Sequence, residues 1–189
     1  KALIMGIPNV GKSTIINILA DRIIAKTGNE PAVTKRQQRI TLKNNIILSD
    51  TPGLLWPKVE NPNSAYRLAT TGAIKDTALS YDDIAFFAAE YLLENYPQLL
   101  KSRYQLDHIP NDEADLMEAI GRKRGCLRAG KQVDIEKTSK ILISELRAGT
   151  IGGVTLETPE MIEKELQELA IKQANKEAKK ANRKQKWKD

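Results

Sequence analysis

The chain has 189 residues, a length that suits one medium-sized domain or two small ones with hydrophobic cores. A single cysteine excludes a disulfide framework, and no apolar run approaches the roughly 20 residues of a membrane span, so we expect a cytoplasmic protein without a membrane partner. The net charge of +6 lies entirely in residues 171–189, which hold eight positive and two negative side chains, while residues 1–170 are balanced.

The first predicted elements are a buried strand over Ala2–Met5 and a helix over Lys12–Ala20, joined by a glycine-rich turn. The turn fits the pattern G-x-x-x-x-G-K-[ST] of a phosphate-binding P-loop, because glycines let the backbone approach a polyphosphate and the helix N-terminus directs amides at it. We expect Lys12 to contact the β- and γ-phosphates and the Ser13 hydroxyl to bind Mg²⁺. An ordinary glycine-containing turn is the alternative. The predicted nucleotide-binding residues of this loop are Gly6, Pro8, Asn9, Val10, Gly11, Lys12, Ser13 and Thr14.

A second predicted part of the site follows a hairpin made by Gln38–Lys43 and Asn45–Ser49. Asp50 at the end of the second strand is placed to hold the water shell of Mg²⁺, and Gly53 supplies an amide for the γ-phosphate. In the polar loop before the hairpin, Thr34 is the candidate switch residue that closes on Mg²⁺ when the γ-phosphate is present. An ordinary turn and a plain surface threonine are the alternatives. The predicted catalytic residues, which position groups and neutralise charge, are Lys12, Thr34 and Gly53.

From about residue 63 the pattern becomes helical. Three helices are predicted before residue 150, and a long helix opens at Thr158-Pro159-Glu160 with an apolar face that fades after Ile171. The three helices run from Asp82 or Asp83 to Asn95, where Pro97 stops the first, from Asn111 to Ile120, and from Asp134 to Ala148. We therefore predict a nucleotide-binding part over 1–75, a helical domain over 76–155 and a helical basic tail over 156–189.

Four stretches together resemble the ribosome biogenesis GTPase A family of circularly permuted GTPases: Gly6–Thr14, Asp50–Lys58, Arg67–Asp76 and Gly121–Cys126. The resemblance covers roughly residues 1–150. It implies an α/β P-loop GTPase domain followed by an all-α C-terminal domain, with GTP or GDP as the nucleotide. It also implies a monomer that acts in late assembly of the large ribosomal subunit, hydrolyses GTP slowly alone and is stimulated by the precursor particle.

The guanine-reading motif Asn-Lys-x-Asp does not occur in the sequence. In a circularly permuted GTPase this motif precedes the P-loop, and the chain begins at Lys1 within a core strand. We therefore expect a fragment whose N-terminal half, with the guanine motif, is missing; a targeting segment in that half would place the protein in an organelle matrix. The resemblance further implies that Asn9 helps to bind K⁺. Leu54 stands where Ras-like enzymes place a water-orienting glutamine, and His108 is interpreted as structural or exposed.

Two groups of basic residues are candidates for contact with ribosomal RNA. The alternatives are a solvated helix end for the first and a solvated extension for the second. Two other functions stay open: an RNA-binding module that senses nucleotide with negligible hydrolysis, and a P-loop ATPase. The predicted RNA contacts are Arg122, Lys123, Arg124, Arg128 and Lys131 in one group, and Lys179, Lys180, Arg183 and Lys184 in the tail.

Overall fold

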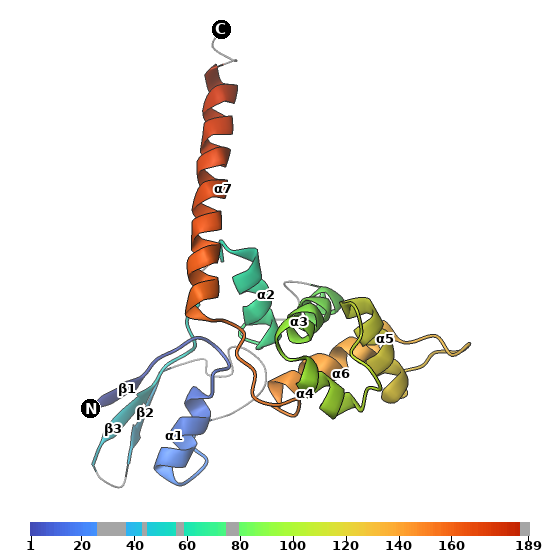
Figure 1. Ribbon diagram of the computed structural model, residues 1–189. Coiled ribbons are helices and arrows are strands. Elements are labelled where there is room, and N and C mark those ends of the chain that lie inside the picture. Colours follow the sequence, from blue (N-terminus) through green and yellow to red (C-terminus); the bar gives the residue numbers. More distant parts are fainter. Residues whose placement is uncertain (26–36, 43–44, 56–58, 75–79, 186–189) are drawn as a thin grey trace. The chain divides into compact units, whose positions relative to one another are not determined.

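The computed structural model describes residues 1–25, 37–42, 45–55, 59–74 and 80–185, with side chains up to residue 179 (Figure 1). The chain divides into two compact units, Lys1–Gly153 and Val154–Asp189. The first unit contains the sheet and helices α1 to α6, and the second contains α7. No helix within the described ranges is long and apolar enough to cross a membrane.

Among the residues that the structure describes, the first unit starts with a three-stranded sheet of order β1-β3-β2. Its strands are β1 (Ala2–Ile4), β2 (Gln38–Thr41) and β3 (Ile47–Asp50). β1 runs parallel to β3, so that Ile4 lies opposite Asp50, and β2 pairs antiparallel with β3. The predicted hairpin is thus confirmed, and Asn45 at its turn takes a φ of 60°, which asparagine tolerates better than most residues.

Helix α1 (Lys12–Ala20) has the predicted bounds and packs its narrow apolar face on the sheet. Ile16 and Ala20 are buried with Ile40 and Leu48 of the strands. The loop after α1 is held by the side-chain amide of Asn17, which accepts from the amides of Ile24 and Ala25 and donates to the Ala25 carbonyl. The other apolar residues predicted for this helix are exposed: Ile15, Ile18 and Leu19.

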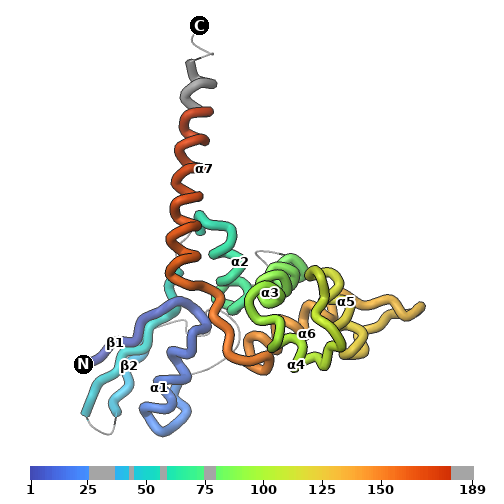
Figure 2. The backbone as a smooth tube through the Cα atoms, in the orientation of Figure 1, coloured from blue at the N-terminus to red at the C-terminus, as the bar shows by residue number. Residues whose placement is uncertain are grey.

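In the described part of the first unit, the helices after the sheet are α2 (Pro62–Thr70), α3 (Tyr81–Asn95), α4 (Pro97–Tyr104), α5 (Glu113–Lys123) and α6 (Ile135–Arg147). α3 contacts α2, α4, α5 and α6, and Figure 2 follows the backbone through this group. Tyr66 of α2 stacks on Phe87 of α3 with ring centroids 5.0 Å apart. The buried side chains at the centre of the group include Ile84, Leu92, Leu116, Met117, Ile120, Leu142 and Ile143.

Three predictions for these helices need correction. Ser80 is the N-cap of α3, so the predicted caps Asp82 and Asp83 lie in its first turn, where acids also favour the helix dipole. Pro97 ends α3 as predicted but also opens α4, which the sequence pattern did not reveal. The predicted helix from Asn111 to Ile120 is instead α5 from Glu113 to Lys123. It continues through Gly121, where a Cβ would collide with the side chain of Val133.

The second unit is dominated by α7 (Pro159–Gln185). Its start is as predicted, since the Thr158 hydroxyl accepts a hydrogen bond from the Met161 amide and Pro159 occupies the first helical position. The side chains of residues 172–179 are all exposed, which agrees with an apolar face that fades after Ile171.

Candidate nucleotide-binding site

The P-loop connects the end of β1 to the start of α1. Two of its residues, Asn9 with φ 59° and Gly11 with φ 83°, have left-handed backbone conformations, and Gly11 is the N-cap of α1. The first turn of α1 contains no acidic residue, so the positive end of the helix dipole is not neutralised by a neighbouring carboxylate. This loop can therefore receive an anion, as the sequence predicts.

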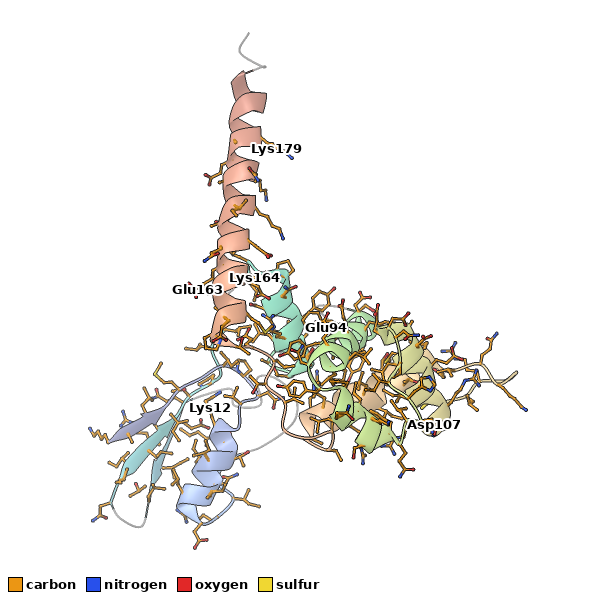
Figure 3. The ribbon with its side chains drawn as sticks, viewed as in Figure 1. Lys12, Glu94, Asp107, Glu163, Lys164 and Lys179 are labelled. Carbon is orange, nitrogen blue, oxygen red and sulfur yellow. The ribbon has the colours of Figure 1, made fainter. Side chains whose placement is uncertain are left out.

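Lys12 is the buried cation of this loop, only 9% exposed at the first residue of α1 (Figure 3). Its ammonium group donates a hydrogen bond of 2.7 Å to the carbonyl of Ile7, across the loop. Burial lowers the pKa of Lys12, and the nearby negative charge of Asp50 partly opposes that shift. A phosphate bound in the loop would likewise favour the charged lysine.

Asp50 is the buried acid of the site, 1% exposed at the end of β3. The parallel pairing of β3 with β1 sets it opposite Ile4, two residues before the P-loop begins. The next residue fixes this edge of the sheet, because the Thr51 hydroxyl donates to the Ile4 carbonyl at 2.7 Å. The sheet thus places a carboxylate within electrostatic reach of Lys12.

Gly53 brings the loop after β3 into direct contact with the P-loop. A Cβ at Gly53 would lie 2.6 Å from the backbone nitrogen and Cα of Pro8, a distance that no side chain can occupy. The Leu54 amide donates to the Gly6 carbonyl at 3.2 Å. The two loops predicted to share one phosphate are therefore packed against each other.

The donor set fits Mg²⁺ bound together with a polyphosphate. Magnesium in nucleotide sites keeps several waters and takes few protein ligands, often one carboxylate with the phosphates. Ser13 at the start of α1 and the buried Asp50 provide a hydroxyl and a carboxylate of this kind. The parts of the chain that the structure describes contain no group of three His, Cys, Asp or Glu residues that could hold a metal without such a ligand.

Three further predicted residues have different outcomes. Thr34 lies outside the described residues, so its role stays a prediction. Leu54 is 69% exposed and offers no polar group to a water molecule. His108 is exposed in the turn between α4 and α5, as predicted.

The basic residues predicted to contact RNA around α5 mostly pair with acids of the chain. The Arg124 guanidinium lies 2.8 Å from a carboxylate oxygen of Glu145, and its Cζ lies 5.3 Å from the centre of the Tyr104 ring. None of the ion pairs found among the described residues includes Lys131, which has a φ of 61° in the loop before α6. Lys179 is exposed on α7, and the side chains of Lys180, Arg183 and Lys184 lie outside the described residues. The other pairs are Arg122 with Glu118, Lys123 with Asp107, and Arg128 with Asp134.

Two residues near the P-loop were missed at the level of sequence. Gly72 follows α2 with a φ of 75°, and a Cβ there would lie 2.9 Å from the side-chain nitrogen of Asn9. Arg147, the last residue of α6, donates to the carbonyls of Ala69 and Thr70 at 2.7 and 2.9 Å. Gly72 could have been found from the sequence, because a glycine just after an amphipathic helix commonly ends that helix. No sequence pattern indicates that Arg147 contacts α2.

The loop between strand and helix, the buried lysine and the buried aspartate define a P-loop nucleotide-binding protein. Residues 1–107 match the family described as 50S ribosome-binding GTPase. Because this match spans more than half of the sequence, the chain belongs to that family. The P-loop GTPase domain predicted from the sequence is therefore confirmed.

Several curated proteins named ribosome biogenesis GTPase A are similar to most of the chain. The protein of Bacillus cereus is 50% identical over 169 residues, which cover 89% of this chain and 57% of the relative. The protein of Priestia megaterium is 51% identical over 166 residues, or 88% and 58% of the two chains. The protein of Thermotoga maritima is 31% identical over 162 residues, or 86% and 58%. The predicted family resemblance is confirmed, and the chain spans less than three fifths of the length of these relatives.

Solved structures of YlqF have the same fold over most of the chain. A GDP-bound structure gives a TM-score of 0.57 and covers 84% of this chain and 60% of its own. A GNP-bound structure from T. maritima gives a TM-score of 0.55 and covers 84% and 59%. Each is 28% identical to this chain.

Proposed function

We propose that this chain is the phosphate-binding part of a GTPase that acts in late assembly of the large ribosomal subunit. The observation that carries the proposal is the buried pair of opposite charges, Lys12 and Asp50, at a P-loop against which Gly53 packs. The names of the relatives support the biological setting, since they are ribosome biogenesis GTPases. On this proposal the partner is the precursor of the large subunit with its rRNA, and the protein works as a cytoplasmic monomer.

In the proposed reaction, water attacks the γ-phosphorus of GTP, the bond to the β-phosphate oxygen breaks, and GDP and phosphate leave. Lys12 exchanges its bond to Ile7 for the β- and γ-phosphates, where its charge balances the charge of the transition state. Ser13, Thr34 and Asp50 are the residues that would hold Mg²⁺, with Asp50 acting through bound water. An ion held by these residues would neutralise negative charge on the phosphates.

Leu54 favours a slow intrinsic rate, because a leucine side chain cannot orient or polarise the attacking water. We therefore propose that another segment or the ribosomal particle supplies the missing group. Asn9, on the exposed turn of the P-loop, is the proposed ligand of K⁺, which would add positive charge beside the phosphates. Leu54 equally favours the second candidate function, a nucleotide-sensing module with negligible hydrolysis.

A circularly permuted order accounts for the absence of Asn-Lys-x-Asp from this sequence. In support, large apolar side chains lie on the outside of β1 and α1, where another layer of a GTPase domain could cover them. Ile18 of α1 is 72% exposed and Leu3 of β1 is 52% exposed. We propose that the part of the domain that packs there carries the guanine-binding residues, and that residues 76–155 form the helical domain that contacts rRNA.

Competition binding tests the division between phosphate and base recognition. Mant-GTP bound to the full chain should be displaced about equally well by GTP, ATP and tripolyphosphate, because the contacts proposed here reach only the phosphates. A strong preference for GTP over tripolyphosphate would contradict the permuted arrangement, and a preference for ATP would favour an ATPase.

Turnover measurements test the ribosomal role and separate the two candidate functions. GTP hydrolysis in K⁺ buffer should rise when purified large ribosomal subunits are added. Equal turnover with and without subunits would contradict a particle-stimulated GTPase, and no turnover in either case would leave the sensing module.

A further inference from the structure

The end of α2 connects the P-loop to the helices that follow it. Gly72 is buried between two side chains from distant parts of the sequence: a Cβ at this position would lie 2.9 Å from Nδ2 of Asn9 and 3.3 Å from Cζ of Arg147. With a φ of 75°, the position also requires a backbone conformation that glycine adopts at little cost. Gly72 therefore allows a P-loop side chain and an α6 side chain to approach the same backbone atom.

Arg147 fixes the last turn of α2. Its guanidinium donates to the carbonyls of Ala69 and Thr70 in the last turn, where carbonyls have no partner four residues ahead within the helix. Its positive charge also lies at the negative end of the helix dipole. The amides of Gly72 and Ala73 close the same turn through bonds to Ala69 and Leu68, so the position of Gly72 is determined by the turn that Arg147 holds.

We propose that Arg147 is a positioning residue for the nucleotide site, acting through the end of α2 and Gly72 on Asn9. Asn9 has a left-handed conformation within the phosphate-binding loop. On this proposal, the contact with Gly72 fixes Asn9 and with it the directions of the neighbouring amides. Because α6 packs on α3 and α5, the same path couples events at the helical region to phosphate binding. This inference rests on the proposed function, since it needs a nucleotide in the P-loop.

A double-mutant cycle on nucleotide affinity tests the path. Arg147→Ala in the full chain should weaken mant-GTP binding by about fivefold, the lower end of typical coupling between sites. In an Asn9→Ala background the same change should have less than about a twofold effect, because the group through which Arg147 acts is gone. Arg147→Lys, which keeps the charge but loses the planar fork, should restore part of the affinity.

Arg103→Ala is the matched control, because Arg103 also ties two helices of the region together but contacts Glu145 instead of α2. It should leave the affinity for mant-GTP unchanged. The inference would be overturned if Arg147→Ala lowered mant-GTP affinity equally in the wild-type and Asn9→Ala backgrounds, or did not lower it at all. Binding of mant-GTP by the wild-type chain would still support the proposed function. Failure of the wild-type chain to bind mant-GTP would reject both.

Hydrogen exchange gives a second measurement that does not depend on a well-folded Arg147→Ala variant. Bound nucleotide should slow exchange of the Gly72 and Ala73 amides in the wild-type chain and in the Arg103→Ala control. The slowing should disappear in Asn9→Ala at saturating nucleotide. Unchanged protection of these amides in Asn9→Ala would show that Asn9 does not carry the coupling.

Discussion

At Gly53 the absence of a side chain decides whether the two phosphate-binding loops can meet. The contact is with backbone atoms of Pro8, which cannot move aside as the end of a flexible side chain could. The Leu54 amide then reaches the Gly6 carbonyl. The close packing of Gly53 on Pro8 therefore fixes the position of the loop after Asp50 relative to the P-loop.

Replacing Gly53 with alanine should therefore separate the loops. We expect mant-GTP affinity to fall by about tenfold or more, since overpacking costs about 1–3 kcal/mol and each 1.4 kcal/mol is about tenfold in affinity. Gly153→Ala is the matched control, because a Cβ there meets nothing within 4 Å. Fluorescence titration measures both variants, and equal affinity of Gly53→Ala and wild type would contradict the packing argument.

Lys12 contributes the positive charge of the proposed phosphate site. Lys12→Ala should abolish measurable mant-GTP binding, because no other side chain of the P-loop itself carries a positive charge. The helical region should stay folded, since the Lys12 ammonium donates its hydrogen bond to the carbonyl of Ile7 within the P-loop itself. Far-UV circular dichroism checks the fold, and retained micromolar affinity would contradict the assignment of the site.

Among the helices, α4, α5 and α6 are joined by a single carboxylate. Glu145 of α6 accepts two hydrogen bonds from Arg103 of α4, at 3.0 and 2.8 Å, and one from Arg124 at the end of α5, at 2.8 Å. The Glu145 side chain is 16% exposed, so these bonds are only partly screened by water. Arg124, predicted as an RNA contact, is thus also part of the packing of the helical region.

Removing the charge of Glu145 should loosen this junction. We expect Glu145→Gln to lower the free energy of unfolding by roughly 1–2 kcal/mol, because hydrogen bonds to a charged group are lost while the volume is kept. Urea denaturation measures the change. Glu136→Gln is the control, because Glu136 forms an exposed pair within one helix, with Lys140, and should change the midpoint little.

The pH dependence of the same variant has a definite sign. Burial raises the pKa of the Glu145 carboxyl, but the hydrogen bonds from Arg103 and the positive charges of Arg124 and Arg103 outweigh it, so the pKa lies below its ordinary value of 4.5. The stabilisation is then present above the unfolded pKa and is lost as the pH falls through the folded one. The gap in urea midpoint between wild type and Glu145→Gln should therefore narrow below about pH 4.5. A constant gap would show that the charge of Glu145 is not responsible.

The sequence predicts the bounds of a helix well where its apolar periodicity and its capping residues indicate the same ends. It predicts them poorly where contacts with distant residues determine the structure. α1 has the predicted bounds, and α6 differs from the predicted helix from Asp134 to Ala148 only in that these two residues are its caps. Glycine is a poor helix former, so the sequence predicts a helix end at Ile120, whereas α5 continues through Gly121 because the close approach of the Val133 side chain requires a residue without a Cβ there. The P-loop and Asp50 follow from a motif, but the contacts of Gly72 and Arg147 join residues far apart in sequence and leave no local pattern.

Across the whole molecule, the excess of positive charge and the candidate nucleotide-binding site lie in different parts of the sequence. Residues 1–170 carry equal numbers of acidic and basic side chains, so the excess belongs to residues 171–189. Residues 172–179 of α7 are exposed, and several basic residues near α5 are already paired with acids. We therefore expect the end of the chain to provide most of the electrostatic attraction to RNA.

Deletion of residues 171–189 should flatten the salt dependence of RNA binding. Each phosphate contact adds about 0.7–0.9 to the slope of log K against log salt concentration, so the loss of up to eight cations should lower the slope by several units. Fluorescence anisotropy with a labelled single-stranded RNA, measured over a series of KCl concentrations, gives the slope. A control chain in which every lysine after residue 171 is replaced by arginine keeps the charge and should keep the slope. If the deletion leaves the slope unchanged, the basic residues near α5 carry the contact instead, since the tail then adds nothing to RNA affinity.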